Sequence, residues 1–345
     1  MYEWIALSAA ICFAATYLIT PYFMRFFSGI ELWATDVQKR LRPVIPLSGG
    51  IPVLFGFLLG FFALVAADTF ILRSQLDTKL LFAALLSMVL ISFIGFFDDL
   101  NVRRQRMNIS SDAVDFKVGL KQWQKPLLTL FAAIPLTVVG AGDSIVSLPF
   151  LGEINFGILF PLLVIPLAVV TVSNATNMLA GFNGLEAGLS AIALSTLGAY
   201  LSLLGRWEAA AIAFCVTASL LAFLRYNWIP ARMFPGDSLT YLSGAAIVSV
   251  ILLGNIERFS IIVFTPWIME ALLKLRGRFK VRSFGNLQPN DTLMAPYRKI
   301  YSLTHVAMKI PQWLNLRQGF NERQVVILLL AMQIIVSAIA FTFFT

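Results

Sequence analysis

Two adjacent carboxylates, Asp98 and Asp99, directly follow an apolar run that ends at residue 97. If that run is a helix, both carboxylates lie at its C-terminal end, where the helix dipole and their mutual repulsion disfavour negative charge. Such a pair is stabilised by a cation, by a nearby lysine or arginine, or by protonation. It is therefore a candidate for metal or phosphate chemistry, and a solvated helix end is the alternative interpretation.

A second polar segment, residues 174–188, contains three asparagines and three glycines but no lysine or arginine. Asn174 and Asn177 are three residues apart, so they share one face if a helix continues through them. Amide oxygens can bind a hard cation such as Mg²⁺, and amide nitrogens can donate to phosphate oxygens. A simple asparagine-capped turn is the alternative, although a turn needs far fewer such residues.

Two further segments and one histidine complete the polar candidates. Asp237, within residues 234–238, is either the N-cap of the following helix or a metal ligand at the membrane boundary. The basic residues between 274 and 282 are explained largely as a lipid-facing anchor. His305 is the single histidine, so no histidine-rich metal site is available and a Ser-His-Asp triad is not expected. We expect it on the surface of an amphipathic helix.

The composition places these segments in a membrane protein. Hydrophobic residues make up 59% of the 345 residues and charged residues 13%, whereas soluble domains are about 45–50% apolar and about 25% charged. The net charge of +8 is best explained by loops beside anionic lipid head groups, and nucleic acid is not an expected partner. The two cysteines can form neither a disulfide framework nor a multi-cysteine metal site.

Apolar runs predict an all-α integral membrane protein with ten transmembrane helices, because a bilayer core requires about 20 apolar residues per helix. One run is interrupted by Glu270 and the others carry no charge. The runs are 4–24, 47–67, 80–97, 126–142, 154–173, 187–205, 209–224, 238–256, 259–273 and 325–345.

Lysine and arginine divide unevenly between alternate loops, with 22 of the 26 on one side. The positive-inside rule makes that side cytoplasmic and both termini non-cytoplasmic. The predicted cytoplasmic loops are about 25–46, 98–125, 174–186, 225–237 and 274–324, within one polytopic domain that spans residues 1–345. In the last loop, residues 288–291 form a turn signal for a small β-hairpin, and residues 298–314 suit an amphipathic interfacial helix.

Together these segments resemble the polyprenyl-phosphate N-acetylhexosamine-1-phosphate transferases over nearly the whole chain. The run 174–188 is the most specific match and is similar to the dolichol-dependent eukaryotic and archaeal branch. Many bacterial members have Asp-Gly where this chain has Ala180-Gly181 and Asn183-Gly184, and the histidine-rich bacterial motif is absent. The other matching segments are Asp36 with Lys39, residues 46–50, residues 95–99, Lys125 and Gly236-Asp237.

The resemblance implies an activity and a set of partners. The enzyme would transfer a HexNAc-1-phosphate, GlcNAc-1-phosphate above all, from a UDP-sugar to a polyprenyl or dolichyl phosphate and release UMP. It would need Mg²⁺, with Mn²⁺ as a substitute, and a homodimer is plausible. It would lie in the cell membrane, or in the endoplasmic reticulum membrane of a eukaryote, with a cytoplasmic active site.

The resemblance also implies roles for individual residues. Asn177 and Asp237 would hold the metal ion, and Asp98 or Asp99 would position or deprotonate the lipid phosphate. The donor would be bound by the remaining candidates: its pyrophosphate by Asn174, Lys125 and Arg282, and its uracil by Asn183 and Phe234.

Two alternatives stay open from the residues alone. A covalent aspartyl-phosphate intermediate competes with direct attack by the lipid phosphate. A membrane transporter of a nucleotide sugar or lipid-linked substrate is the rival function. Transporters place ionisable groups near the bilayer midplane and often repeat one half of the chain in the other. Here the polar groups lie at helix ends and no half repeats the other, which favours the enzyme.

Overall fold

The computed structural model describes residues 1–73, 76–100, 103–109, 112–118, 120–121, 123–148 and 152–344. Its described part is mostly helical, and eight helices are long and apolar enough to cross a membrane. These are α1 (Tyr2–Gly29), α2 (Gly50–Ala67) continued by η1 (Asp68–Leu72), α3 (Thr78–Leu100), η2 (Phe160–Val164) continued by α6 (Ile165–Met178), α7 (Leu185–Leu203), α8 (Trp207–Asn227), α9 (Gly236–Gly254) and α13 (Glu322–Phe344).

The other two predicted spans each form a pair of shorter helices. Residues 126–142 fall in α4 (Gln124–Ala132) and α5 (Ile134–Val138), and residues 259–273 fall in α10 (Glu257–Val263) and α11 (Thr265–Arg276). Pro135 and Pro266 stand at the start of the second helix of each pair. Proline has no backbone N–H and its ring clashes with the carbonyl four residues earlier, which interrupts a helix. Eight continuous helices are thus observed, and ten crossings remain a prediction.

Side chains from neighbouring helices bind the backbone at both interruptions. The Ser87 hydroxyl on α3 donates to the Ala132 carbonyl at 2.6 Å, and the Gln333 amide on α13 donates to the Val263 carbonyl at 3.0 Å. Both donors are fully buried. An unpaired carbonyl costs several kcal/mol where no water is available. These two hydrogen bonds therefore allow broken helices inside an apolar bundle.

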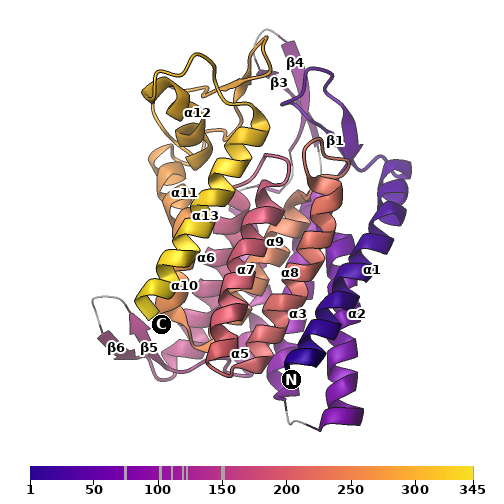
Figure 1. The fold of residues 1–345 in the computed structure, drawn as a ribbon, viewed down its shortest axis with the longest axis vertical. Coiled ribbons are helices and arrows are strands. Elements are labelled where there is room, and N and C mark those ends of the chain that lie inside the picture. The colour runs from indigo at the N-terminus through magenta and orange to yellow at the C-terminus, as the bar shows by residue number, and fades with distance from the viewer. Residues whose placement is uncertain are drawn as a thin grey trace.

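The polar loops gather at one end of the bundle (Figure 1). The N- and C-termini both lie toward the lower end in this view, while β1, β3, β4 and α12 lie at the upper end. Helix α9 lies centrally and contacts α2, α3, α6, α7 and α8. The N-terminus of α9 is therefore surrounded by other helices, and it carries Asp237.

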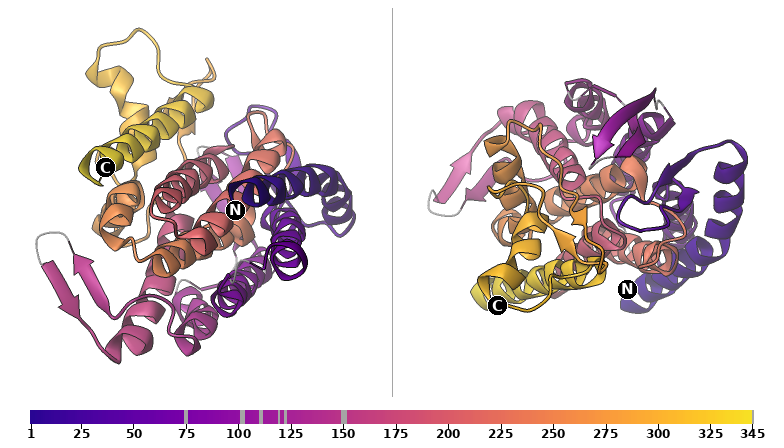
Figure 2. Two further views of the ribbon diagram at one scale, coloured as in Figure 1. Left: turned by 60° about the horizontal axis from the view of Figure 1, so that its bottom comes forward. Right: turned by 90° about the horizontal axis from the view of Figure 1, so that it is seen from above.

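In the described part of the chain, four two-stranded antiparallel sheets occupy the connections. The hairpin predicted in the last loop is confirmed as β7 (Asn286–Leu287) with β8 (Leu293–Met294), and the predicted amphipathic helix is α12 (Leu303–Trp313). Three hairpins were not predicted, and the β5–β6 pair projects from the side of the bundle (Figure 2). They are β1 (Trp33–Thr35) with β2 (Val44–Pro46), β3 (Arg103–Ile109) with β4 (Asp112–Val118), and β5 (Ile145–Leu148) with β6 (Gly152–Asn155).

The expectation that His305 lies on the surface is wrong. Its side chain is fully buried on α12, on the face that also buries Leu303, Ala307 and Met308. Burial lowers the pKa of His305 to about 4, so the imidazole is neutral at neutral pH. The sequence did not reveal this because α12 packs against α11, α13 and strand β8, and its own residues do not indicate these neighbours.

Helices α1 and α2 approach closely where small residues meet. Gly56 and Gly60, spaced as in a small-xxx-small motif, face Thr16 and Cys12 of α1. A Cβ atom added at Gly60 would lie 2.1 Å from the Cys12 sulfur and 2.4 Å from the Ser8 carbonyl oxygen. Small residues allow the two helix backbones to approach closely. This close packing stabilises helix association in a membrane, where burial of apolar side chains contributes little.

We expect Gly60→Ala to destabilise the protein by about 1–3 kcal/mol, because the added methyl group overpacks this contact. The measurement is thermal unfolding in detergent, followed by tryptophan fluorescence. Gly29→Ala on α1 is the control, since a Cβ there meets nothing within 4 Å. Equal melting temperatures for the two variants would contradict the packing argument.

Candidate active site

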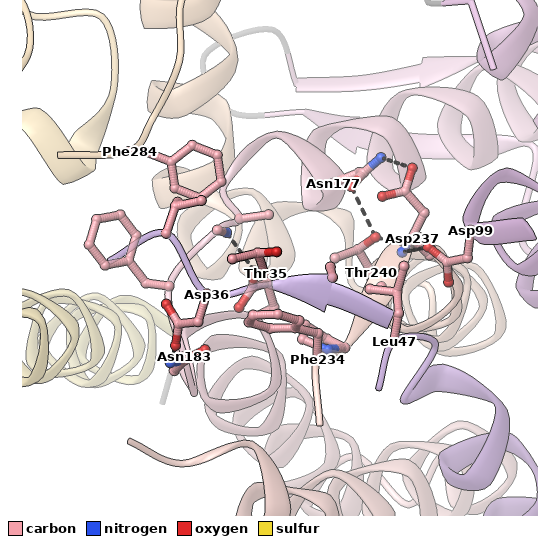
Figure 3. Close-up of a pocket in the computed structure, with 18 of the residues that line it drawn as sticks. Thr35, Asp36, Leu47, Asp99, Asn177, Asn183, Phe234, Asp237, Thr240 and Phe284 are labelled. Atoms are coloured by element: carbon pink, nitrogen blue, oxygen red, sulfur yellow. Dashed lines mark hydrogen bonds between the residues drawn. The ribbon is translucent and has the colours of Figure 1, made fainter. Parts of the chain in front are cut away.

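A cavity of about 390 Å³ opens among the polar loops. Its lining comes from the first loop, the end of α3, the start of α4, the α6–α7 connection, the start of α9 and the last loop. Figure 3 shows how side chains from these separate segments face a common space. Seven of the nine predicted site residues line it: Asp98, Asp99, Lys125, Asn177, Asn183, Phe234 and Asp237.

Lys125 joins two carboxylates at one side of the cavity. Its ammonium lies 2.5 Å from Oδ2 of Asp98 and 2.6 Å from Oδ2 of Asp237. Asp98 also accepts the backbone N–H of Leu120. Among the described side chains that line the cavity, Lys125 is the only basic one. With Asp99 included, three carboxylates face one lysine, so this side of the cavity has a shortage of positive charge.

Asp99 binds the first turn of α9. Its carboxylate accepts the backbone N–H of Asp237 at 2.8 Å and that of Ser238 at 3.3 Å, and the Ser48 hydroxyl at 2.7 Å. Gly236 has φ of +69°, and a Cβ there would lie 2.3 Å from Asp99 Oδ2. The carboxylate of α3 thus satisfies free N–H groups at the positive end of α9.

Asp237 is not the N-cap of its own helix. The N-cap is Pro235, without a side-chain cap hydrogen bond, because Asp99 takes that place. The Asp237 carboxylate instead accepts from the Asn177 amide at 3.1 Å and from Lys125. Close helix packing permits this arrangement, since a Cβ at Gly95 of α3 would lie 2.5 Å from the Asp237 carbonyl oxygen.

Asn177 and Asp237 are adjacent, as a shared metal ion requires. Thr240 donates to the Asn177 amide oxygen at 3.1 Å and holds the side chain in place. Carboxylate and amide oxygens suit a hard cation such as Mg²⁺. No group of three or more His, Cys, Asp or Glu side chains able to hold an ion occurs in the described part of the chain. Asn177 and Asp237 offer one amide oxygen and one carboxylate, which is the chemistry of a hard-cation site but not a complete ligand set.

Asn183 lies at the other side of the cavity. Its amide donates to Asp36 Oδ2 at 2.7 Å, and its backbone N–H donates to Glu322 Oε1 at 3.0 Å. Phe234 is fixed by its backbone, since its N–H donates to the Pro46 carbonyl at 2.8 Å. Figure 3 shows Asn183 and Phe234 on the side of the cavity away from Asp99 and Asn177. This side presents the Asn183 amide, the Asp36 carboxylate and the Phe234 ring.

Two predicted site residues do not line the cavity. Asn174 lies one turn before Asn177 on α6, and its amide donates to the Val170 carbonyl at 2.8 Å and to the Thr129 hydroxyl at 3.1 Å. Arg282 precedes the lining residue Phe284 in the last loop. Fifteen other residues line the cavity, and among them Gln38, Glu186, Thr240 and Phe284 had no predicted role. Glu186 lies within the recognised segment 174–188 and Thr240 shortly after the segment 234–238, whereas Gln38 and Phe284 carry no local signal.

The two aspartates should respond differently to neutralisation. Asp99→Asn loses the charged acceptor at the start of α9 and places an amide N–H₂ among donors, so we expect a loss of about 1–3 kcal/mol of stability. Asp98→Asn leaves Lys125 paired with Asp237 and should cost less. Thermal unfolding of both variants in detergent measures the difference. An Asp98→Asn variant that melts lower than Asp99→Asn would refute this division.

Curated relatives cover nearly the whole chain. A protein of Saccharolobus solfataricus, named as a UDP-N-acetylglucosamine–dolichyl-phosphate N-acetylglucosaminephosphotransferase, is 38% identical over 339 residues, which is 97% of this chain and 95% of that protein. A protein of Sulfolobus acidocaldarius with the same name is 31% identical over 348 residues, 99% of this chain and 96% of that protein.

A more distant similarity extends to bacteria. The phospho-N-acetylmuramoyl-pentapeptide-transferase of Clostridium botulinum is 30% identical over 289 residues, which is 82% of this chain and 83% of that protein. Residues 81–255 match glycosyl transferase family 4, and this stretch includes Asp98, Asp99, Lys125, Asn177, Asn183 and Asp237 of the cavity. The chain therefore belongs to glycosyl transferase family 4.

Proposed function

We propose that the protein transfers GlcNAc-1-phosphate from UDP-GlcNAc to a dolichyl or other polyprenyl phosphate and releases UMP. The observation that carries this proposal is the cluster of Lys125, Asp98, Asp237 and Asn177 within one cavity. Such a cluster suits reactions between phosphate groups, which depend mainly on positioning and electrostatics. The archaeal relatives are named for these two substrates.

The charges of the cavity suit a magnesium complex of the donor. The surplus of carboxylates over the single Lys125 favours a bound divalent cation. We propose that Asn177 and Asp237 hold Mg²⁺, for which Mn²⁺ can substitute. When bound, the ion neutralises the pyrophosphate and stabilises the leaving phosphate. Lys125 then places its ammonium beside the phosphoryl group during transfer.

The chemical step is an exchange at one phosphorus. An oxygen of the lipid phosphate attacks the phosphorus that bears the sugar, and the bond from that phosphorus to the bridging oxygen breaks. UMP leaves with the bridging oxygen and its electron pair, and the lipid keeps the sugar phosphate through a new pyrophosphate bond. No side chain of the protein needs to form a covalent bond.

Direct attack is also favoured by the surroundings of the two aspartates. Asp99 accepts three hydrogen bonds and holds α9 in place, so it is a positioning residue. Asp98, beside Lys125, is the carboxylate that positions or deprotonates the lipid phosphate. A phosphorylated protein trapped with UDP-GlcNAc alone would instead establish the aspartyl-phosphate route.

The donor nucleotide would lie toward Asn183 and Phe234. Phe234 offers a ring for stacking on uracil, and Asn183 offers an amide for its polar edge. Asn174 supports Asn177 from the preceding turn of the same helix, and its predicted contact with the pyrophosphate would require it to leave Thr129. We propose that Arg282, two residues before the lining residue Phe284, contacts the pyrophosphate.

The side of the membrane that the cavity faces is proposed from the distribution of basic residues. We propose that the cavity faces the cytoplasm, because the loops at its end of the bundle carry most of the lysines and arginines. Both termini would then be non-cytoplasmic, and the site would be at the inner surface of the cell membrane. We also propose a homodimer, on the resemblance to the family alone.

Transport is the rival activity. A transporter would hold its ionisable residues near the middle of the bundle, between discontinuous helices. The interruptions between α4 and α5 and between α10 and α11 are occupied by Ser87 and Gln333, which are uncharged. Asp98, Asp99 and Asp237 of the cavity lie at the end of α3 and the start of α9. These positions favour chemistry at the membrane surface.

The purified protein in detergent should release UMP from UDP-GlcNAc when both Mg²⁺ and a short polyprenyl phosphate are present. Omission of the lipid phosphate or addition of EDTA should abolish release, because both reactants and their neutralising ion are required. The assay is chromatography of the nucleotides and of the lipid product. A transporter would leave UDP-GlcNAc intact under all these conditions.

Asp237→Ala should reduce turnover at least 10³-fold, since it removes a proposed metal ligand and the partner of Lys125. Lys125→Met should lower kcat by about 10²–10³-fold, in line with the loss of one preorganised electrostatic contact. Glu153→Ala on the exposed β6 strand is the matched acidic control and should behave as the wild type. Turnover of Asp237→Ala near the wild-type rate would exclude Asp237 as a metal ligand.

A further inference from the structure

Glu322 is a buried carboxylate that contacts the connection between α6 and α7, residues 179–184, at Asn183. It is the first residue of α13, and only 5% of its surface is exposed. Its Oε1 accepts the backbone N–H of Asn183 at 3.0 Å. The same carboxylate forms an ion pair with Lys39 of the first loop. Three segments far apart in the sequence therefore meet at one point.

Two further contacts bind the first loop to the same connection. The Asn183 amide donates to Asp36 Oδ2 at 2.7 Å, and Asp36 Oδ1 accepts the Gln38 backbone N–H at 3.2 Å. The Gln38 amide donates to the Gly181 carbonyl at 2.7 Å. Asn183 is thus held through its side chain by the first loop and through its backbone by Glu322.

We propose that Lys39 and Glu322 are positioning residues that orient Asn183 for the donor nucleotide. This inference rests on the proposed function, because Asn183 is assigned to the donor there. Lys39 and Glu322 both lie outside residues 81–255, the part of the chain that matches the family. Neither residue lines the cavity, so any effect on substrate is transmitted through Asn183 and the first loop.

Burial makes the two partners unequal. The side chain of Glu322 is 6% exposed and that of Lys39 is 23% exposed. Removal of Lys39 leaves a buried carboxylate without its cation, which is strongly unfavourable. Removal of the charge from Glu322 leaves a lysine that can extend into water, and a glutamine still offers an oxygen to the Asn183 N–H. The lysine substitution should therefore be the more harmful one.

A nearby ion pair supplies a matched control. Arg40 lies 2.6 Å from Asp291, and the two side chains are 54% and 66% exposed. This pair also joins the first loop to another segment, but neither residue lines the cavity or contacts Asn183. Exposed ion pairs contribute little energy. Arg40→Gln should therefore leave the kinetics unchanged.

The test compares Lys39→Met, Lys39→Arg, Glu322→Gln, the double variant Lys39→Met with Glu322→Gln, and Arg40→Gln. Steady-state release of UMP gives kcat and the KM values for UDP-GlcNAc and polyprenyl phosphate, and calorimetric titration with Mg²⁺ and UDP gives a Kd without turnover. We expect Lys39→Met to raise the KM for UDP-GlcNAc and the Kd for UDP about tenfold, the size of effect that one charged hydrogen-bonded contact provides.

The other variants sharpen the result. Glu322→Gln should raise the same two constants about threefold, and the double variant should resemble Glu322→Gln, because the buried charge is then absent. Lys39→Arg keeps the positive charge beside Glu322, so its KM for UDP-GlcNAc and its Kd for UDP should equal those of the wild type. The kcat at saturating donor and the KM for polyprenyl phosphate should stay within about twofold of wild type.

Two outcomes would overturn the inference: unchanged donor constants in Lys39→Met, or a parallel rise in the KM for polyprenyl phosphate, which indicates general distortion. Thermal unfolding of each variant identifies such distortion independently. If the wild type binds UDP but releases no UMP, the proposed function fails, and the Kd series still decides whether the Lys39–Glu322 pair positions the nucleotide.

Discussion

The carboxylate of Asp99 holds three parts of the chain together at the start of α9. It accepts two backbone N–H groups of that helix and the hydroxyl of Ser48 in the first loop. Because the free N–H groups of a helix start are its positive end, a buried carboxylate is stabilised there. This contact fixes the backbone at Asp237, whose carboxylate in turn contacts Lys125 and Asn177.

The cavity is divided into two chemically different sides. One side concentrates Asp98, Asp237 and Lys125 around a short network of charged contacts. The other side presents the amide of Asn183 and the ring of Phe234. A nucleotide sugar has the same division, with anionic phosphates at one part and a flat base at another. The first loop contacts both sides, through Ser48 at one and Asp36 at the other.

The types and spacing of the polar residues were sufficient to find most of the cavity. Asn177 and Asp237, 60 residues apart in the chain, are in hydrogen-bond contact, and the last-loop hairpin is present. Local patterns could not separate the roles of Asp98 and Asp99, because adjacent residues look alike until the partner helix is known. They also could not show that Asn174 faces Thr129, since the sequence of one helix does not indicate which helix packs against each of its faces.

Tertiary covering explains the other differences. His305 is buried because α12 packs against α11, α13 and β8, and the periodicity of α12 alone does not indicate these neighbours. Apolar runs located the segments 126–142 and 259–273 but not their interruptions, which require both a proline and a hydrogen-bond donor on a different helix. The hairpins β1–β2 and β5–β6 were missed because strands of three or four residues provide little alternation to detect.

The two interrupted segments have a consequence for how the ends of the chain are tagged. Eight long helices and ten crossings are both even numbers, so either count leaves the N- and C-termini on one face of the bilayer, as Figure 1 places them at one end of the bundle. Reporter fusions at the termini are therefore blind to the interrupted helices. The cavity itself separates the two topologies, because the end of α3, the start of α4 and the end of α6 all line it. The α4–α5 pair therefore leads the chain from the cavity end of the bundle to the other end, where α6 begins.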